Sequence, residues 1–186
     1  MDQNLNALET MLQSLKHDDA MIRENAAYLL GEMSLEALAL SKDTLKSSGE
    51  LAKINPLTEP VNKDKALRAL EIATVDSDPW VRGNAADALG KLGSPKSIHV
   101  LTPLLKDEDK VVRYSAVEAM GRIGTKAVVE HLVNALMDGD WSVRLSAAKF
   151  LSNHPDQSAE DALRISSKDV NRDVRDYSMT ALAQLS

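Results

Sequence analysis

The chain has 186 residues, of which 44% are apolar and 27% are charged, a composition typical of a folded domain with a substantial core. Its net charge of −6 lacks the basic footprint with which proteins usually bind nucleic acids or anionic membranes. Because the sequence contains no cysteine, disulfides, thiolate catalysis and cysteine-ligated metal centres are excluded.

The N-terminal segment, MDQNLNALETMLQ, has neither a basic start nor an apolar block, so it does not resemble a secretory signal. No apolar stretch approaches the ~20 residues that a membrane-spanning helix needs. We therefore expect a cytoplasmic protein with no membrane contact. Apolar residues at helical spacing predict a first helix over residues 3–16, with Leu8 and Leu12 among its core positions.

A Val-Arg dipeptide, once replaced by Ile-Arg, recurs along the chain, and its last four copies are evenly spaced. The arginines of the five copies are Arg23, Arg82, Arg113, Arg144 and Arg175. Four further columns match in register: an Asp or Asn four residues before each arginine, a small residue three after, an apolar residue seven after, and eight after a glycine in the first three copies and a serine or alanine in the last two. Self-similarity at a fixed period predicts a repeated supersecondary unit.

Each period predicts two helices. The first begins at an Asp or Asn that can accept hydrogen bonds from free backbone N–H groups, and a glycine ends or loosens it, as at residues 90–93 and 121–124. The second helix is expected at residues 97–106 and 126–137. Since one helical hairpin cannot bury its apolar stripe alone, we predict a right-handed α-α superhelix of about five stacked hairpins, in a single domain over residues 1–186.

Residues 78–93 read Asp-Pro-Trp-Val-Arg-Gly-Asn-Ala-Ala-Asp-Ala-Leu-Gly-Lys-Leu-Gly. This stretch closely resembles the signature of the HEAT-like repeats first associated with phycobilisome lyases. The resemblance covers residues 76–186 well and residues 3–33 adequately. It implies a HEAT-like solenoid but says little about function, because such repeats occur in scaffolds, adaptors, chaperone-like factors and a few enzymes.

Residues 34–62 interrupt the period, because the step from Arg23 to Arg82 is nearly twice the step between later copies. A degenerate repeat would put Gly49 at the arginine position and Pro56 near an expected leucine. We therefore favour an irregular insertion between the two helices of the first repeat, with some helix near its start and the second helix resuming at residues 63–75. Such an insertion is either a place for specific function or a tolerated surface loop.

We interpret the arginine column as a structural ladder. An aspartate four residues before each arginine can pair with it on the same helical turn. The neighbouring repeat offers carboxylates at matching places, namely Asp76, Asp107, Asp138 and Asp169. A fully paired guanidinium has few donors left for a ligand, which argues against the alternative of an anion-binding column. The predicted ladder comprises Arg23, Arg82, Arg113, Arg144, Arg175, Asp78, Asp109 and Asp140.

No residue pattern indicates catalysis, a metal or a cofactor, and we expect none of the three. No two histidines share a helix at the spacing that metal ligands need; they are His17, His99, His131 and His154. The two tryptophans, Trp80 and Trp141, stand just before a Val-Arg pair. They are read either as packing over the turn or as anchors of an interface, where tryptophan is over-represented.

The second helices are expected to line the concave face, as the resemblance implies. Opposite their core stripe, positions related by the repeat spacing form rows whose charge changes from basic toward the N-terminus to acidic toward the C-terminus. The candidate partner-binding residues in these rows are Lys65, Arg68, Ile72, Lys96, His99, Pro103, Glu130, Asn134, Asp161 and Ile165. Variation on a constant scaffold is typical of a specific binding surface, although solvent-facing positions also vary freely.

These patterns predict a non-catalytic scaffold or adaptor that binds another protein. The alternative is an enzyme or a bilin-lyase-like subunit whose chemistry depends on a ligand or a second chain. The net charge argues against a nucleic-acid partner.

Overall fold

The computed structural model describes residues 3–43 and 60–185, and these residues form helices and the short connections between them, with no β-strand among them. The first helices of the repeats are α2 (Ala20–Asp43), α5 (Pro79–Leu92), α7 (Lys110–Ile123), α9 (Trp141–Asn153) and α11 (Arg172–Leu185). The second helices are α1 (Gln3–Ser14), α4 (Pro60–Ala73), α6 (Ile98–Leu104), α8 (Val129–Ala135) and α10 (Glu160–Ser166).

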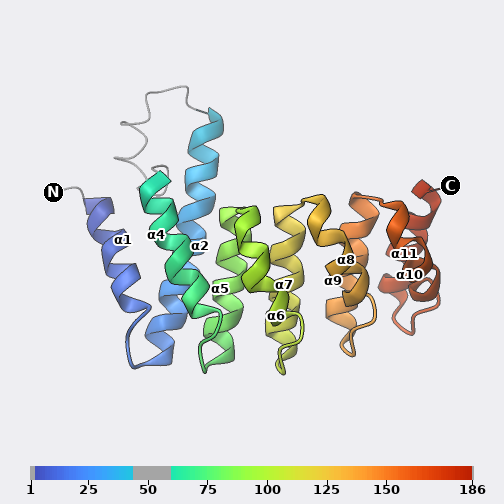
Figure 1. The fold of residues 1–186 in the computed structure, drawn as a ribbon, viewed down its shortest axis with the longest axis horizontal. Coiled ribbons are helices and arrows are strands. Elements are labelled where there is room, and N and C mark those ends of the chain that lie inside the picture. The colour runs from blue at the N-terminus through green and yellow to red at the C-terminus, as the bar shows by residue number, and fades with distance from the viewer. Residues whose placement is uncertain (1–2, 44–59, 186) are drawn as a thin grey trace.

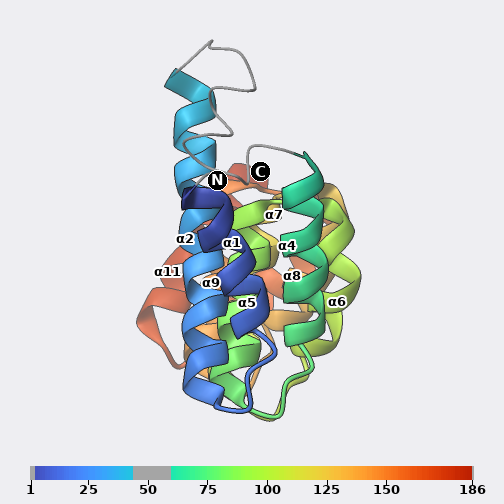
Figure 2. The same cartoon turned by 90° about the vertical axis from the view of Figure 1, so that its left-hand side faces the viewer.

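The hairpins stack side by side into an elongated row, with the N-terminus at one end and the C-terminus at the other (Figure 1). Seen from the N-terminal end, α4, α6 and α8 form one layer, and α2, α9 and α11 lie on the other side (Figure 2). One continuous apolar core, which extends from Leu8 to Ala181, lies between the layers. This arrangement confirms the predicted all-α solenoid.

Aspartate caps determine where the first helices begin. The Asp78 carboxylate accepts hydrogen bonds from the N–H groups of Trp80 and Val81, and Asp109 and Asp140 accept in the same way from the residue two positions on. An extended backbone at the cap and a short acceptor side chain favour helix initiation at these positions. Helix α5 ends at Gly93 and α7 ends at Gly124, each with a φ of 65° that only glycine adopts without cost.

The preceding glycine of each signature has a different role, because it lies inside its helix and does not end it. A Cβ atom added at Gly90 would lie 2.5 Å from the Cα atom of Ala119 in the next first helix. At Gly121 it would lie 3.1 Å from the Phe150 ring. These glycines therefore allow successive first helices to approach closely.

The second helices α6, α8 and α10 confirm the prediction in kind but have shorter α-helical cores. Their first turn is a 3₁₀ helix, namely η2 (Pro95–Ser97), η3 (Lys126–Val128) and η4 (Gln157–Ala159), and seven α-helical residues follow each turn. Each helix points one fully buried leucine into the core: Leu101, Leu132 and Leu163.

The irregular segment is partly described. Helix α2 continues as far as Asp43, beyond the ends of its neighbours (Figures 1 and 2), and α4 begins at Pro60, shortly before the expected start. The rest of the predicted insertion, residues 44–59, lies outside the described residues. Because Gly31 in α2 packs directly on Ala88 in α5, these two first helices are neighbours, which favours an insertion over an intervening repeat. None of the described helices is long and apolar enough to cross a membrane.

Candidate functional site

Four of the five predicted ladder arginines hold the aspartate of the following repeat with two parallel hydrogen bonds. In Arg82, Nε donates to Asp107 Oδ2 at 2.8 Å and Nη2 donates to Oδ1 at 2.8 Å. The same geometry, with distances of 2.6–3.1 Å, joins the three other pairs: Arg23–Asp76, Arg113–Asp138 and Arg144–Asp169. Bidentate, charge-assisted pairs of this kind are among the stronger hydrogen bonds in proteins.

The remaining guanidinium nitrogen is also used. Nη1 of Arg113 donates to the carbonyl oxygens of Asp107 and Glu108, and the other ladder arginines repeat this contact. The hydrogen bonds from Arg144 hold the pKa of Asp169 below its usual range. The side chains of the four pairs are only 9–18% exposed. The ladder therefore has few donors left for an external anion, as expected for a structural role.

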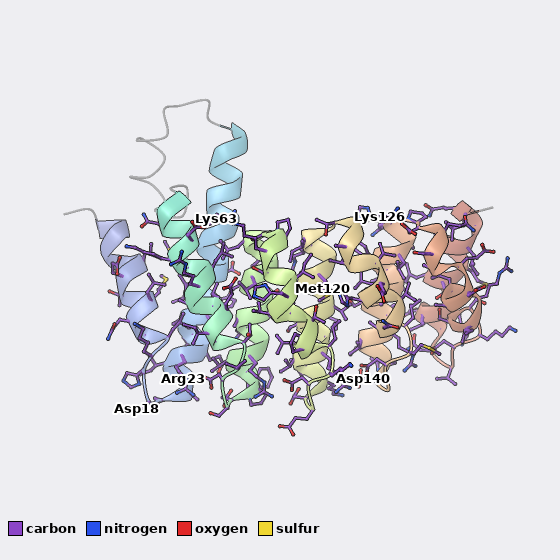
Figure 3. All side chains as sticks on the ribbon, in the orientation of Figure 1. Asp18, Arg23, Lys63, Met120, Lys126 and Asp140 are labelled. Carbon is purple, nitrogen blue, oxygen red and sulfur yellow. The ribbon has the colours of Figure 1, made fainter. Side chains whose placement is uncertain are left out.

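The structure corrects one part of the predicted ladder. Asp78, Asp109 and Asp140 do not form the expected ion pairs with the arginines four residues later, because their carboxylates cap the helix N-termini. The hydrogen bonds from Ser142 to Asp140 lower the pKa of that carboxyl to about 2. These residues lie near the same end of the helices as the ladder, where Arg23 and Asp140 are seen (Figure 3).

Arg175 differs from the other ladder arginines. Its Nη1 donates to the carbonyl oxygens of Asp169 and Val170, as in the earlier repeats. Among the side chains that the structure describes, no carboxylate pairs with its Nε and Nη2 edge. In this repeat the ladder contact is therefore incomplete.

The structure places all ten candidate partner-binding residues on η2 or on the second helices, and all ten side chains are exposed. Lys65, Arg68 and Ile72 line a groove of about 380 Å³ between α1 and α4. Glu130 and Asn134 line a groove of about 370 Å³ between α6 and α8. The other five residues lie on the same layer outside these grooves: Lys96, His99, Pro103, Asp161 and Ile165.

Sequence reasoning missed one member of this surface. Glu9 lies in the groove between α1 and α4, and its carboxylate is 3.1 Å from the Lys65 ammonium. Glu9 is separated from Arg68 by the same number of residues as Arg23 is from Arg82. Extending the row of Arg68 to the first repeat would therefore have identified Glu9. The charge gradient along the rows therefore starts with an acidic residue, which compensates part of the basic charge of Lys65.

Two other sequence expectations concern residues outside these rows. Trp80 and Trp141 lie in the first turns of α5 and α9, and each is about half exposed, so neither is buried over its turn. Among the residues that the structure describes, no group of three or more histidine, aspartate or glutamate side chains could hold a metal ion.

The sequence matches the family described as HEAT repeats in three overlapping stretches, residues 49–121, 66–138 and 99–183. No curated protein sequence matches this chain.

Several solved structures share the fold. The complex of CpcE and CpcF of phycocyanin lyase from Nostoc is 20% identical, with a TM-score of 0.69 over 95% of this chain and 65% of the other. A designed armadillo repeat protein in complex with the peptide (KR)4 is 17% identical, with a TM-score of 0.66 over 97% and 82%. An archaeal HEAT-like repeats protein from Thermococcus onnurineus is 17% identical, with a TM-score of 0.54 over 98% and 71%. At these identities the similarity shows the fold alone.

Proposed function

The chain belongs to the HEAT-repeat family, and from that premise we propose that it is a non-catalytic scaffold that binds another protein along its second helices. Repeat solenoids commonly bind partners through a continuous face built from equivalent positions. The observation that carries the proposal is that all ten row positions are exposed on one layer of successive repeats.

The charged side chains of the rows are available to a partner, whereas those of the ladder are already paired with one another. Among the described residues, Arg68, Lys96, Glu130 and Asp161 form no ion pair, whereas the four complete ladder pairs satisfy one another. An exposed, unpaired charge can meet a partner without first breaking an internal contact. These charges run from basic at Arg68 to acidic at Asp161, which favours an elongated partner of opposite polarity.

The proposal is supported by the neighbours only at the level of the fold. The designed armadillo protein holds a peptide, and the phycocyanin lyase structure is a complex of two chains. A lyase-like subunit therefore remains the alternative outcome of the experiment, and no residue of this chain argues for its chemistry.

The experiment uses the purified chain as bait in extract of its own organism, beside a variant with Arg68→Glu and Lys96→Glu. We expect one polypeptide to be captured by the native chain and its affinity to fall about 10-fold or more in the variant, because like charges then face each other. The thermal midpoint of unfolding should hardly change, since neither side chain is buried.

A control variant with Lys168→Glu and Arg172→Glu makes the same charge change at exposed positions outside the rows. It should retain the partner. Equal capture by the native chain and by the Arg68 and Lys96 variant would contradict the proposed surface. A stoichiometric pigment or small molecule in place of a polypeptide would favour the lyase-like alternative.

A further inference from the structure

Tryptophan and tyrosine are confined to one layer of the solenoid. All five such residues of the chain lie on first helices, and their exposed fractions are 37–57%: Tyr28, Trp80, Tyr114, Trp141 and Tyr177. The rows of the proposed scaffold surface lie on the second helices. The aromatic side chains therefore mark a separate surface, which the proposed function does not use.

Two of these aromatic residues meet in a groove between α7 and α9. Its apolar lining includes Val111, Tyr114, Trp141 and Leu145, and its volume is about 310 Å³. This volume is at the lower end of the range of ligand pockets, about 300 Å³, and gives room for one or two large side chains of a partner. Burial at the groove raises the pKa of Tyr114 above its usual value.

The repeat register shows that the fold does not need this aromatic pair. The positions equivalent to Tyr114 are occupied by Gly83, Leu145 and Asp176. The positions equivalent to Trp141 are occupied by Pro79, Lys110 and Arg172. Because first helices of the same kind form with all of these residues, the pair at α7 and α9 is a local addition to a constant scaffold.

Two lysines flank the groove. The Lys110 side chain is 63% exposed, with its ammonium 3.2 Å from Asp140. The Lys149 ammonium lies 5.6 Å from the centre of the Tyr177 ring, and no carboxylate in the described part of the chain pairs with it. The groove's own carboxylate, Glu118, accepts a hydrogen bond from the Ser146 hydroxyl at 2.5 Å. The residues that line the groove therefore carry one net positive charge, from two lysines and one glutamate, and Asp140 beside Lys110 balances it, which leaves Lys149 as the cation without a carboxylate partner.

We propose that this groove is a second docking site, which binds a short peptide segment that carries a large apolar side chain next to carboxylates. The apolar side chain would pack on Tyr114, Trp141 and Leu145, since half-exposed tryptophan and tyrosine are frequent centres of binding energy. A carboxylate would pair with Lys149, and a second with the exposed ammonium of Lys110, which it would share with Asp140; these pairs set the orientation of the segment. The site and the rows lie on opposite layers, so one chain can hold two partners.

The first test selects peptides from a displayed library of random heptapeptides on the native chain and on a Lys110→Glu, Lys149→Glu variant. We expect the native chain to enrich sequences with Asp or Glu next to Leu, Phe or Trp, and the variant to lose them. The Arg68→Glu, Lys96→Glu variant should enrich the same sequences as the native chain, which separates this site from the proposed scaffold surface. Enrichment that is equal on the groove variant, or that lacks acidic residues, would overturn the proposal.

The second test measures binding of an enriched peptide by tryptophan fluorescence. Trp80→Phe leaves Trp141 as the single tryptophan, so a saturable spectral shift reports on the groove itself. Tyr114→Asp introduces the residue type that occupies this column in the last repeat, and should fold normally while weakening the peptide about 10-fold or more. No shift, an unchanged affinity, or a shift that follows protein concentration without peptide would each contradict docking of such a segment.

Discussion

Packing restricts the residues of the first helices more strongly than those of the second helices. First helices α5, α7 and α9 have 13 or 14 residues, begin at an aspartate cap and approach their neighbours through glycine and alanine. Second helices α6, α8 and α10 have seven residues, begin in a 3₁₀ turn and meet the core through a narrow apolar stripe. Contact between repeats therefore restricts the inner face of the first helices most strongly, and outward positions of both layers are left to vary.

Among the substitutions that test this difference, Gly90→Ala should have the largest effect on stability. The added Cβ atom would lie 2.5 Å from the backbone of Ala119, so α5 and α7 would have to move apart. We expect the free energy of unfolding to fall by about 3 kcal/mol despite the better helix propensity of alanine. Urea unfolding followed by circular dichroism measures it.

Gly139→Ala is the matched control, because nothing lies within 4 Å of a Cβ atom added there. It should change the free energy of unfolding by less than about 0.5 kcal/mol. If the two substitutions had equal effects, close approach of the first helices would not be a source of stability.

Arg113→Ala tests the ladder that joins one repeat to the next. It leaves the Asp138 carboxylate, which is 11% exposed, without its guanidinium partner. We expect a loss of about 2 kcal/mol, less than for a fully buried pair because water still reaches the site. Chemical unfolding of the two chains gives the difference.

Arg175→Ala removes an arginine that holds no carboxylate among the described residues, so its cost should be clearly smaller than that of Arg113→Ala. If Arg175→Ala lowered the free energy of unfolding as much as Arg113→Ala, the backbone contacts of the arginines, and not the bidentate pairs, would provide the stability.

Ser97→Ala gives the smallest expected effect, and its sign is opposite. Ser97 is fully buried in the first turn of the second helix, and its hydroxyl has no hydrogen-bond partner among the described residues. The equivalent positions hold Ala66, Val128 and Ala159. We expect the free energy of unfolding to rise by about 1 kcal/mol, because an unpaired buried hydroxyl is removed.

Ser166→Ala serves as the comparison, since the Ser166 hydroxyl donates to the Ala162 carbonyl oxygen at 2.9 Å. Its loss should not stabilise the chain. An increase in the thermal midpoint for both serine variants would show that burial alone, and not the missing partner, determines the effect.

The repeat and its ladder could be predicted because both are properties of spacing. The constant period puts an arginine, and an aspartate 25 residues further along, at equivalent places in successive repeats, as for Arg113 and Asp138. The choice between Asp138 and Asp109 as partner could not be predicted, because it depends on which carboxylate the helix N-terminus already uses.

The grooves were harder to predict for a different reason. The groove of Tyr114 and Trp141 forms because α7 and α9 bring residues from two different repeat positions side by side. The sequence pattern at either repeat position does not reveal that the two residues meet. The exposed rows, in contrast, follow from helical spacing alone, and the structure places each of their members where the spacing predicts.

The spacing of the ladder also has a consequence for the order of folding. Arg82, Arg113 and Arg144 each reach a carboxylate 25 residues further along the chain, whereas Arg23 must reach one that is 53 residues away. Doubling a loop raises the entropic cost of closing it by about 0.6 kcal/mol. Contacts of short sequence separation also form faster. The central repeats should therefore assemble first and the N-terminal repeat last, so that the chain begins to open at the end where its period is interrupted.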